Sequence, residues 1–257
     1  NLIVKAGGTN RSVTLGTLSG SDTATATGGD IEITATGAVT THATLQAKNN
    51  VTIDSSGSTV NINKNITSDT GSIMLNSDGQ MILNGSTVQA AGDIWLHSAT
   101  NNIRLNNATS VTSNSGDIDI YTKGAGGAGL IYLSGSSSIA ATNGVVTMAT
   151  DGPITTVANS EISAGGNILL DSNSGMLTLD GTVKATGTGS DIFLTADDMI
   201  ISAAVSTTDG NIYLYDNNKG FTLGSNAGTG VKLDAAEIAN LQPGGEGKGL
   251  TIGKGKQ

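Results

Sequence analysis

The ionisable side chains that could act in catalysis are few and scattered. Asp197 and Asp198 are the only adjacent acidic pair, and Lys184 is the only base near them in the sequence. Paired carboxylates are the groups that polysaccharide-cleaving enzymes use. These two acids directly precede the apolar stretch 199–201, where acids are common in turns. We therefore predict no catalytic residues.

Metal and cofactor chemistry is equally poorly supported. His42 and His97 are far apart, and neither has a second His at ligand spacing, so we predict no histidine metal site. Asp93 and Asp117 could share Ca²⁺, because hard cations prefer oxygen ligands. The sequence lacks the dense glycine–aspartate nonapeptide of calcium-binding β-rolls, however. We expect no cofactor and favour backbone capping for both aspartates.

The two aspartates belong to a longer series of small polar side chains, each of which precedes an apolar residue. If the series lines up along one edge of a repeated structure, each side chain can bond to backbone groups at a turn. Its other members are Asp30, Asn50, Ser72, Asn167, Asp191 and Asn211.

Large apolar and aromatic side chains form another series. Trp95 lies between Ile94 and Leu96, and in a strand such a residue points away from the face that its neighbours bury. Exposed apolar stripes usually mark contact surfaces, so we predict a contact face. A covering loop, or the β-propensity of large residues, is the alternative. The candidate contact residues are Met74, Trp95, Tyr121, Leu169, Phe193, Tyr213 and Tyr215.

A degenerate repeat must position all of these residues. A Gly or Asn, a small polar residue and an apolar-x-apolar pair recur about every 22 residues, as in Gly71-Ser72-Ile73 and Gly92-Asp93-Ile94. Two further apolar columns keep the same period. One is a series of apolar pairs two positions apart, from Val60 and Ile62 to Phe221 and Leu223. The other is a series of single apolar residues from Ile66 to Val205.

Three apolar clusters per repeat predict three short strands per turn of a coil, which we call a rung. The expected fold is all-β: a right-handed, single-stranded parallel β-helix (β-solenoid) of about eleven rungs. Rungs spaced at the distance between strands give a rod roughly 50 Å long. Residues 1–257 are predicted to form one continuous domain, with the register less clear in 1–29 and 224–257.

One rung is longer than the others. Its extra residues are the Gly-rich stretch 123–129, which we predict to be a loop between the first and second strands of that rung. At the two ends, 2–6 and 250–254 resemble ordinary rung strands, and we expect no capping helix at either end. The coil is then expected to continue in a longer chain or to stack head-to-tail on other copies.

Composition limits the partners. The chain has no Cys, a net charge of −9 and 12 Lys and Arg in 257 residues. The cations are scattered, so nucleic acid is not an expected partner. No apolar run approaches the roughly 20 residues of a membrane-spanning helix, so we expect no membrane insertion.

The repeat Gly189-Ser190-Asp191-Ile192-Phe193-Leu194-Thr195-Ala196 resembles those of filamentous-haemagglutinin-like exoproteins and related giant bacterial surface proteins. The stretches 235–244 and 250–253 are similar to a recurring unit of their shafts. The resemblance covers nearly the whole chain. It implies a β-helical shaft that extends from a bacterial cell and supports adhesion or cell contact. The secretion domain of that family carries an Asn-Pro-containing motif near its start, and neither Pro153 nor Pro243 lies in such a setting. The chain therefore resembles the shaft and not the secretion domain.

We therefore expect a non-enzymatic, extracellular shaft or filament segment of a bacterial surface protein that acts as a stiff rod. Its expected partners are neighbouring rungs, copies of itself, and glycans or proteins of a host or cell surface. The alternative is a carbohydrate-active β-helix enzyme, a polysaccharide lyase or hydrolase. Grouped acidic and basic side chains on one outer face would favour the enzyme.

Overall fold

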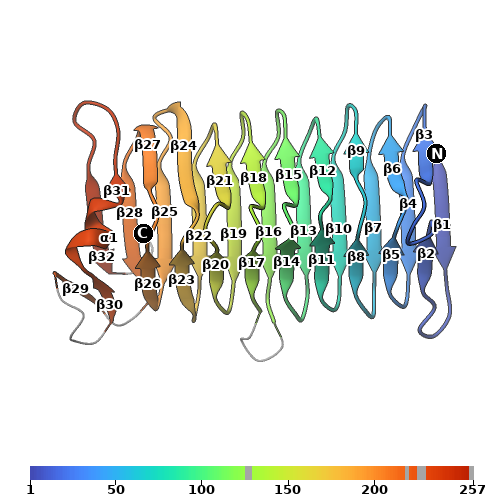
Figure 1. Cartoon of the computed structure of the whole chain (residues 1–257), viewed down its shortest axis with the longest axis horizontal. Coiled ribbons are helices and arrows are strands. Elements are labelled where there is room, and N and C mark those ends of the chain that lie inside the picture. Colours follow the sequence, from blue (N-terminus) through green and yellow to red (C-terminus); the bar gives the residue numbers. More distant parts are fainter. Residues whose placement is uncertain (125–128, 218–219, 225–229, 255–257) are drawn as a thin grey trace.

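The apolar-x-apolar pairs form parallel strands that stack into a long coil (Figure 1). The structure is a computed structural model, and it describes residues 1–124, 129–217, 220–224 and 230–254. It is an all-β parallel β-solenoid of about 9 turns with about 22 residues per turn. Consecutive turns follow one another along the long axis, which confirms the predicted architecture. The right-handed sense of the coil stays a prediction.

Three parallel sheets run the length of the coil, one for each apolar column. In the described part of the chain the first sheet is 11-stranded, in the order β1 (Leu2–Ala6), β4 (Ile31–Ala35), β7 (Val51–Ser55), β10 (Ile73–Ser77), β13 (Ile94–Ser98), β16 (Ile118–Thr122), β19 (Val146–Thr150), β22 (Ile168–Ser172), β25 (Ile192–Ala196), β28 (Ile212–Asp216) and β32 (Leu250–Lys254).

The other two sheets are slightly shorter. Among the described residues the second sheet is 9-stranded, in the order β2 (Val13–Leu15), β5 (Val39–Thr41), β8 (Val60–Ile62), β11 (Met81–Asn84), β14 (Ile103–Asn106), β17 (Ile131–Leu133), β20 (Ile154–Thr156), β23 (Met176–Leu179) and β26 (Asp198–Ile201). The third, over the same residues, is 10-stranded, in the order β3 (Thr23–Ala26), β6 (Thr44–Ala47), β9 (Ile66–Ser68), β12 (Thr87–Ala90), β15 (Ser110–Ser113), β18 (Ser138–Ala141), β21 (Glu161–Ala164), β24 (Thr182–Thr188), β27 (Val205–Asp209) and β31 (Leu241–Gln242).

The core is an aliphatic stack inside the coil. In β13, Ile94 and Leu96 are fully buried while Trp95 between them is only half-buried, as strand alternation predicts. Each inward residue pairs with its equivalent one rung away, as Ile73 does with Ile94. No rung could bury this face alone, so the stacking of neighbouring rungs supplies the stability.

Buried hydroxyls line one corner of the coil, next to the aliphatic stack. A Ser or Thr recurs at the fifth position of the first-sheet strands from β7 to β22, and its hydroxyl donates to a backbone carbonyl of a turn. Four of these bonds are Ser55 to Gly37 (2.7 Å), Ser98 to Gly79 (2.7 Å), Thr150 to Gly129 (2.6 Å) and Ser172 to Gly152 (2.7 Å).

The segment 123–129, predicted to be a loop, falls between the end of β16 at Thr122 and the start of β17 at Ile131. Residues 125–128 of the predicted segment 123–129 lie outside the described residues. The register resumes immediately afterwards, because Ile131 pairs with Ile103 of the preceding rung. The insertion therefore leaves the stacking of the second sheet intact.

The C-terminal turn differs from the prediction in two ways. Phe221 and Leu223 were expected in the second apolar column, but β29 (Phe221–Leu223) pairs with β30 (Val231–Leu233) in a separate 2-stranded sheet. It is β30 that lies against β26, with Val231 and Leu233 fully buried. The aliphatic pair therefore occupies the core in place of the pair containing Phe221.

The expectation of no terminal helix is also wrong. Helix α1 (Ala235–Ala239) occupies part of the tail that was assigned to a shaft repeat. Asp234 and Glu237 form a capping box, in which each side chain accepts a hydrogen bond from the other's backbone N–H at 2.9 Å. Glu237 also accepts from the backbone N–H of Ile201 at 3.2 Å, which fastens the helix to β26. These two departures leave about 9 complete turns in place of eleven.

The 250–254 strand was predicted correctly: β32 pairs with β28 and closes the first sheet. No helix in the described part of the chain has the length and apolar character that crossing a membrane requires.

Candidate functional site

The predicted contact residues do share one outer face, that of the first sheet. Each five-residue strand directs its second and fourth side chains outward, and the strand register places equivalent positions side by side. The second-position column reads Met74, Trp95, Asp119, Thr147, Leu169, Phe193 and Tyr213. The fourth-position column reads His97, Tyr121, Ala149, Asp171, Thr195 and Tyr215.

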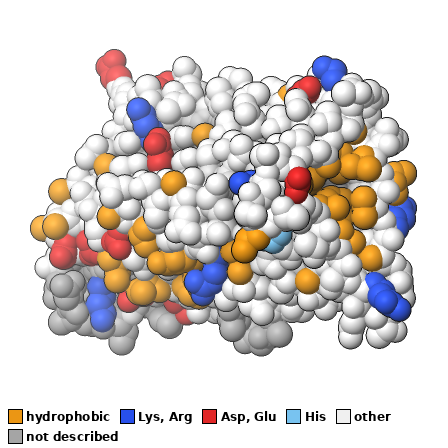
Figure 2. Space-filling model, turned by 45° about the vertical axis from the view of Figure 1, so that its right-hand side comes forward, with side chains coloured by type: hydrophobic (Ala, Val, Ile, Leu, Met, Phe, Trp, Pro, Cys, Tyr) orange, Lys and Arg blue, Asp and Glu red, His pale blue; other side chains and the backbone are white. Residues whose placement is uncertain are grey.

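The chain's aromatic side chains concentrate on this face. It has one Trp, four Tyr and two Phe, and five of these seven lie in the two columns. The other two are Phe221 on β29 and Tyr132 on β17 of the second sheet. The centroid of the Tyr132 ring lies 5.5 Å from the Arg104 guanidinium carbon. The space-filling view shows hydrophobic side chains gathered in patches on a surface with few charges (Figure 2).

The small side chains Thr147 and Ala149 on β19 separate two clusters of larger side chains on this face. In the first, the His97 ring nitrogen Nε2 lies 3.0 Å from the Asp119 carboxylate. The His97 and Tyr121 rings form a T-shaped pair with their centroids 6.0 Å apart. Met74 and Trp95 lie alongside, and Met74 and Tyr121 are exposed. This cluster is an outer surface held by the His97–Asp119 and His97–Tyr121 contacts.

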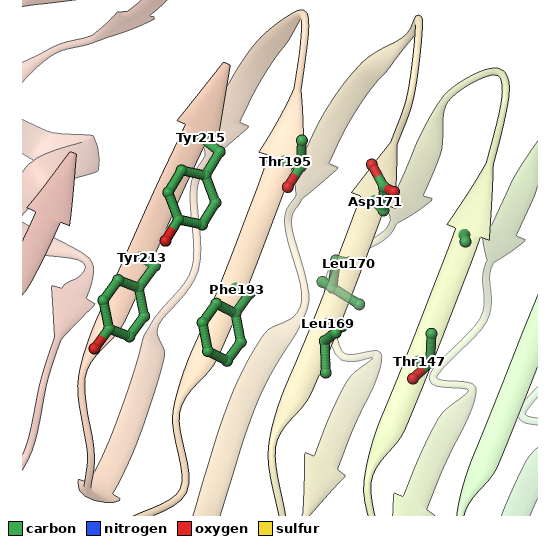
Figure 3. A pocket seen from close by; sticks show the side chains of 9 residues that line it. Thr147, Leu169, Leu170, Asp171, Phe193, Thr195, Tyr213 and Tyr215 are labelled. Atoms are coloured by element: carbon green, nitrogen blue, oxygen red, sulfur yellow. The ribbon is translucent and has the colours of Figure 1, made fainter. Parts of the chain in front are cut away.

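The second cluster surrounds a hollow of about 600 Å³ that opens to solvent. We call it the aromatic hollow. It is lined by Thr147, Ala149, Leu169, Leu170, Asp171, Phe193, Thr195, Tyr213 and Tyr215 (Figure 3). The small side chains of β19 leave this space open, and the aromatic rings of β25 and β28 lie beside it. The predicted contact residues Leu169, Phe193, Tyr213 and Tyr215 are thus brought together, whereas Met74, Trp95 and Tyr121 are separate from them.

The three rings of the aromatic hollow are almost parallel. Phe193 and Tyr213 stack with centroids 4.9 Å apart and planes within 6°, because a parallel sheet holds equivalent residues at about that spacing. Tyr213 and Tyr215 are two residues apart on β28, with centroids 6.3 Å apart and planes within 11°. The rings therefore form a nearly parallel row and do not enclose a cage.

Asp171 and Thr195 are lining residues that the sequence reasoning missed. They occupy the fourth strand position, in register with Tyr215, so a polar row runs beside the apolar row Leu169–Phe193–Tyr213. The alternation that identified Tyr215 also identifies them. They were missed because only large side chains were considered.

The small polar series caps the backbone along one edge of the coil. Asp93 Oδ1 accepts from the backbone N–H of Asp117 at 2.8 Å, and Asp117 Oδ1 accepts from that of Val145 at 2.7 Å. Asp30, Asn50, Ser72, Asn167, Asp191 and Asn211 accept equivalent bonds from the next rung. Among the described residues no group of three or more His, Cys, Asp or Glu side chains is arranged to hold a metal ion.

Replacing Asp117 with Asn separates capping from calcium binding. The amide keeps an acceptor oxygen for Val145, so we expect D117N to change the free energy of unfolding by less than about 0.5 kcal/mol. D117A removes the acceptor and should cost about 1 kcal/mol. Urea unfolding with and without EDTA measures both. A Ca²⁺ site would instead make D117N destabilising and EDTA harmful to the unsubstituted chain.

The residues considered for catalysis are not brought together. Asp198 lies on β26 of the second sheet, where its Oδ1 accepts from the backbone N–H groups of Met199 and Lys232 at 3.0 and 3.4 Å. Asp197 accepts from the Asn217 side chain at 3.2 Å. Lys184 lies on β24 of the third sheet. His42, between β5 and β6, is likewise remote from His97 on β13.

One carboxyl group of the first sheet, that of Asp54, has a raised pKa. Burial raises the pKa of Asp54 on β7, and the nearby charge of Asp78 raises this pKa further. Asp54 is at the fourth strand position, and four strands lie between β7 and β22, on which Asp171 lies. It therefore takes no part in the aromatic hollow.

Comparison of the chain with protein-family models, with curated proteins and with solved structures gives no match. The resemblance to filamentous-haemagglutinin-like shafts therefore stays a prediction from the repeat.

Proposed function

We propose that the chain is a non-enzymatic segment of an extracellular shaft, which acts as a stiff rod on a bacterial surface and makes contacts through its first sheet. The observation that carries this proposal is the continuity of the first sheet through all its strands from β1 to β32. Extended parallel ladders and a continuous aliphatic core resist bending, because every rung is bonded to both of its neighbours.

The variety of side chains that the outward positions can accept supports the same role. Stability comes from inward side chains and backbone ladders, so outward positions can vary without loss of the rod. The aromatic hollow carries a single carboxylate, Asp171, among its lining residues, whereas glycoside hydrolysis usually uses a pair. Lys184 and Asp198 belong to other sheets. This arrangement favours the rod over the carbohydrate-active enzyme.

Rod assembly is part of the proposal, with rungs of a longer chain or head-to-tail copies as neighbours. Leu2 and Val4 of β1 are half-buried, whereas their partners Ile31 and Ile33 on β4 are fully buried. A neighbouring rung, from a longer chain or from another copy, would cover these two half-buried side chains.

Electron microscopy of the purified chain and of native material tests the rod. We expect straight, uniform rods, and fibres whose lengths are multiples of one chain if copies stack. V4K places a charge in the stacking surface and should shorten such fibres, whereas I3K on the outward side of the same strand should not. Flexible or irregular particles would contradict the shaft. Single short rods under all conditions would contradict stacking of copies, and antibody labelling of intact cells tests surface location.

A further inference from the structure

We propose that the aromatic hollow binds a neutral, extended saccharide chain laid on the rings of Phe193, Tyr213 and Tyr215. The inference rests on the proposed role of the first sheet as a contact face, and it names the ligand class of that face. The structure supports it through ring geometry, the polar row beside the rings, and size and charge.

Ring geometry selects a flat, apolar ligand face. Pyranose rings expose C–H groups on their broad faces, and these pack on aromatic rings as other apolar surfaces do. Tyr213 and Tyr215 follow one another along β28 with planes within 11°, so consecutive units of an extended chain can lie on both. A methylated ammonium group is instead held by rings on several sides, which nearly parallel rings cannot provide.

The polar row supplies partners for sugar hydroxyls. Asp171, Thr195 and Tyr215 stand side by side on β22, β25 and β28 (Figure 3). The carboxylate accepts hydrogen bonds, and the phenol both donates and accepts. A saccharide that covers the rings with its C–H face thus directs its hydroxyl edge toward this row. Sites for small molecules commonly combine such apolar surface with a few polar groups.

Size and charge exclude the main competing ligands. A volume of about 600 Å³ suits a few sugar units and lies within the usual range of small-ligand sites. A typical protein partner would cover about 800 Å² on each side, whereas this hollow is confined to four neighbouring strands, β19, β22, β25 and β28. The lining contains no Lys or Arg, and Asp171 would repel an acidic polysaccharide.

Calorimetric titration of the purified chain tests the proposal, with cellohexaose as the neutral probe and a hyaluronan hexasaccharide as the acidic one. We expect saturable binding of cellohexaose alone. F193A and Y213A should each weaken the association constant at least about tenfold, which corresponds to one stacking contact. Y213F keeps the ring and should retain most of the affinity. The matched control is Y132A, which removes a tyrosine from the second sheet and should bind normally.

Circular dichroism and electron micrographs of each variant confirm that the coil is intact, so that lost binding reports on the site. Absence of saturable cellohexaose binding would overturn the proposal, as would equal loss in Y132A or tighter binding of hyaluronan. None of these outcomes bears on the rod, which the micrographs assess independently. Irregular particles with normal cellohexaose binding would overturn the shaft and leave the saccharide site standing.

Discussion

L170A is expected to lower the free energy of unfolding by about 2–5 kcal/mol, whereas L169A should cost less than about 1 kcal/mol. The two leucines are neighbours on β22, and both changes remove the same atoms. Leu170 is 1 % exposed and Leu169 is 37 % exposed. The difference between the variants therefore isolates burial from residue type.

The cost at Leu170 comes from both neighbouring rungs. Leu170 is stacked between Met148 of β19 and Leu194 of β25, so truncation leaves a cavity that neither rung can fill without shifting its strand. Urea unfolding measures both variants, and hydrogen exchange of β19 and β25 locates the loss. Equal destabilisation by the two changes would contradict the inward and outward assignment of the first sheet.

G144A is expected to destabilise the chain by about 3 kcal/mol or more, because the coil has no room for a side chain at that corner. A Cβ at Gly144 would lie 2.1 Å from the carbonyl oxygen of Gly116 in the preceding rung and 2.6 Å from Asp117 Oδ1. The backbone would have to move away, and the ladder beginning at Val146 would move with it.

The matched control is G28A, at an exposed turn where a Cβ meets nothing within 4 Å. We expect this variant to unfold within about 0.5 kcal/mol of the unsubstituted chain. Thermal unfolding followed by circular dichroism compares the two. A harmless G144A would show that rungs are not held at the observed separation, and the close packing of turn on turn would then be wrong.

The repeated part of the fold could be predicted from the sequence because the same constraint acts on every rung. A side chain facing the interior must be apolar, and its equivalent recurs about one turn later. Ile73, Ile94 and Ile118 are therefore recognisable without any coordinates. The Gly-rich insertion was located for the same reason, since the columns on either side of it keep their spacing.

The last turn could not be predicted in this way because two apolar pairs compete for one position. Either Phe221/Leu223 or Val231/Leu233 could occupy the second column, and spacing alone favoured the earlier pair. The packing against β26 favours the later one. Helix α1 did carry a local signal, the Asp234–Glu237 capping box, but the rung pattern was extended across it.

The sequence by itself determined which side chains face outward on the first sheet, since alternation along a strand depends only on position. Tertiary structure decided how those side chains combine. Whether Phe193 stacks on Tyr213 depends on strand register between rungs, and the hollow beside them depends on small residues that are more than 20 residues away in the chain, such as Thr147. Periodicity is a local property of the chain, whereas a binding surface forms only when separate rungs are brought into contact.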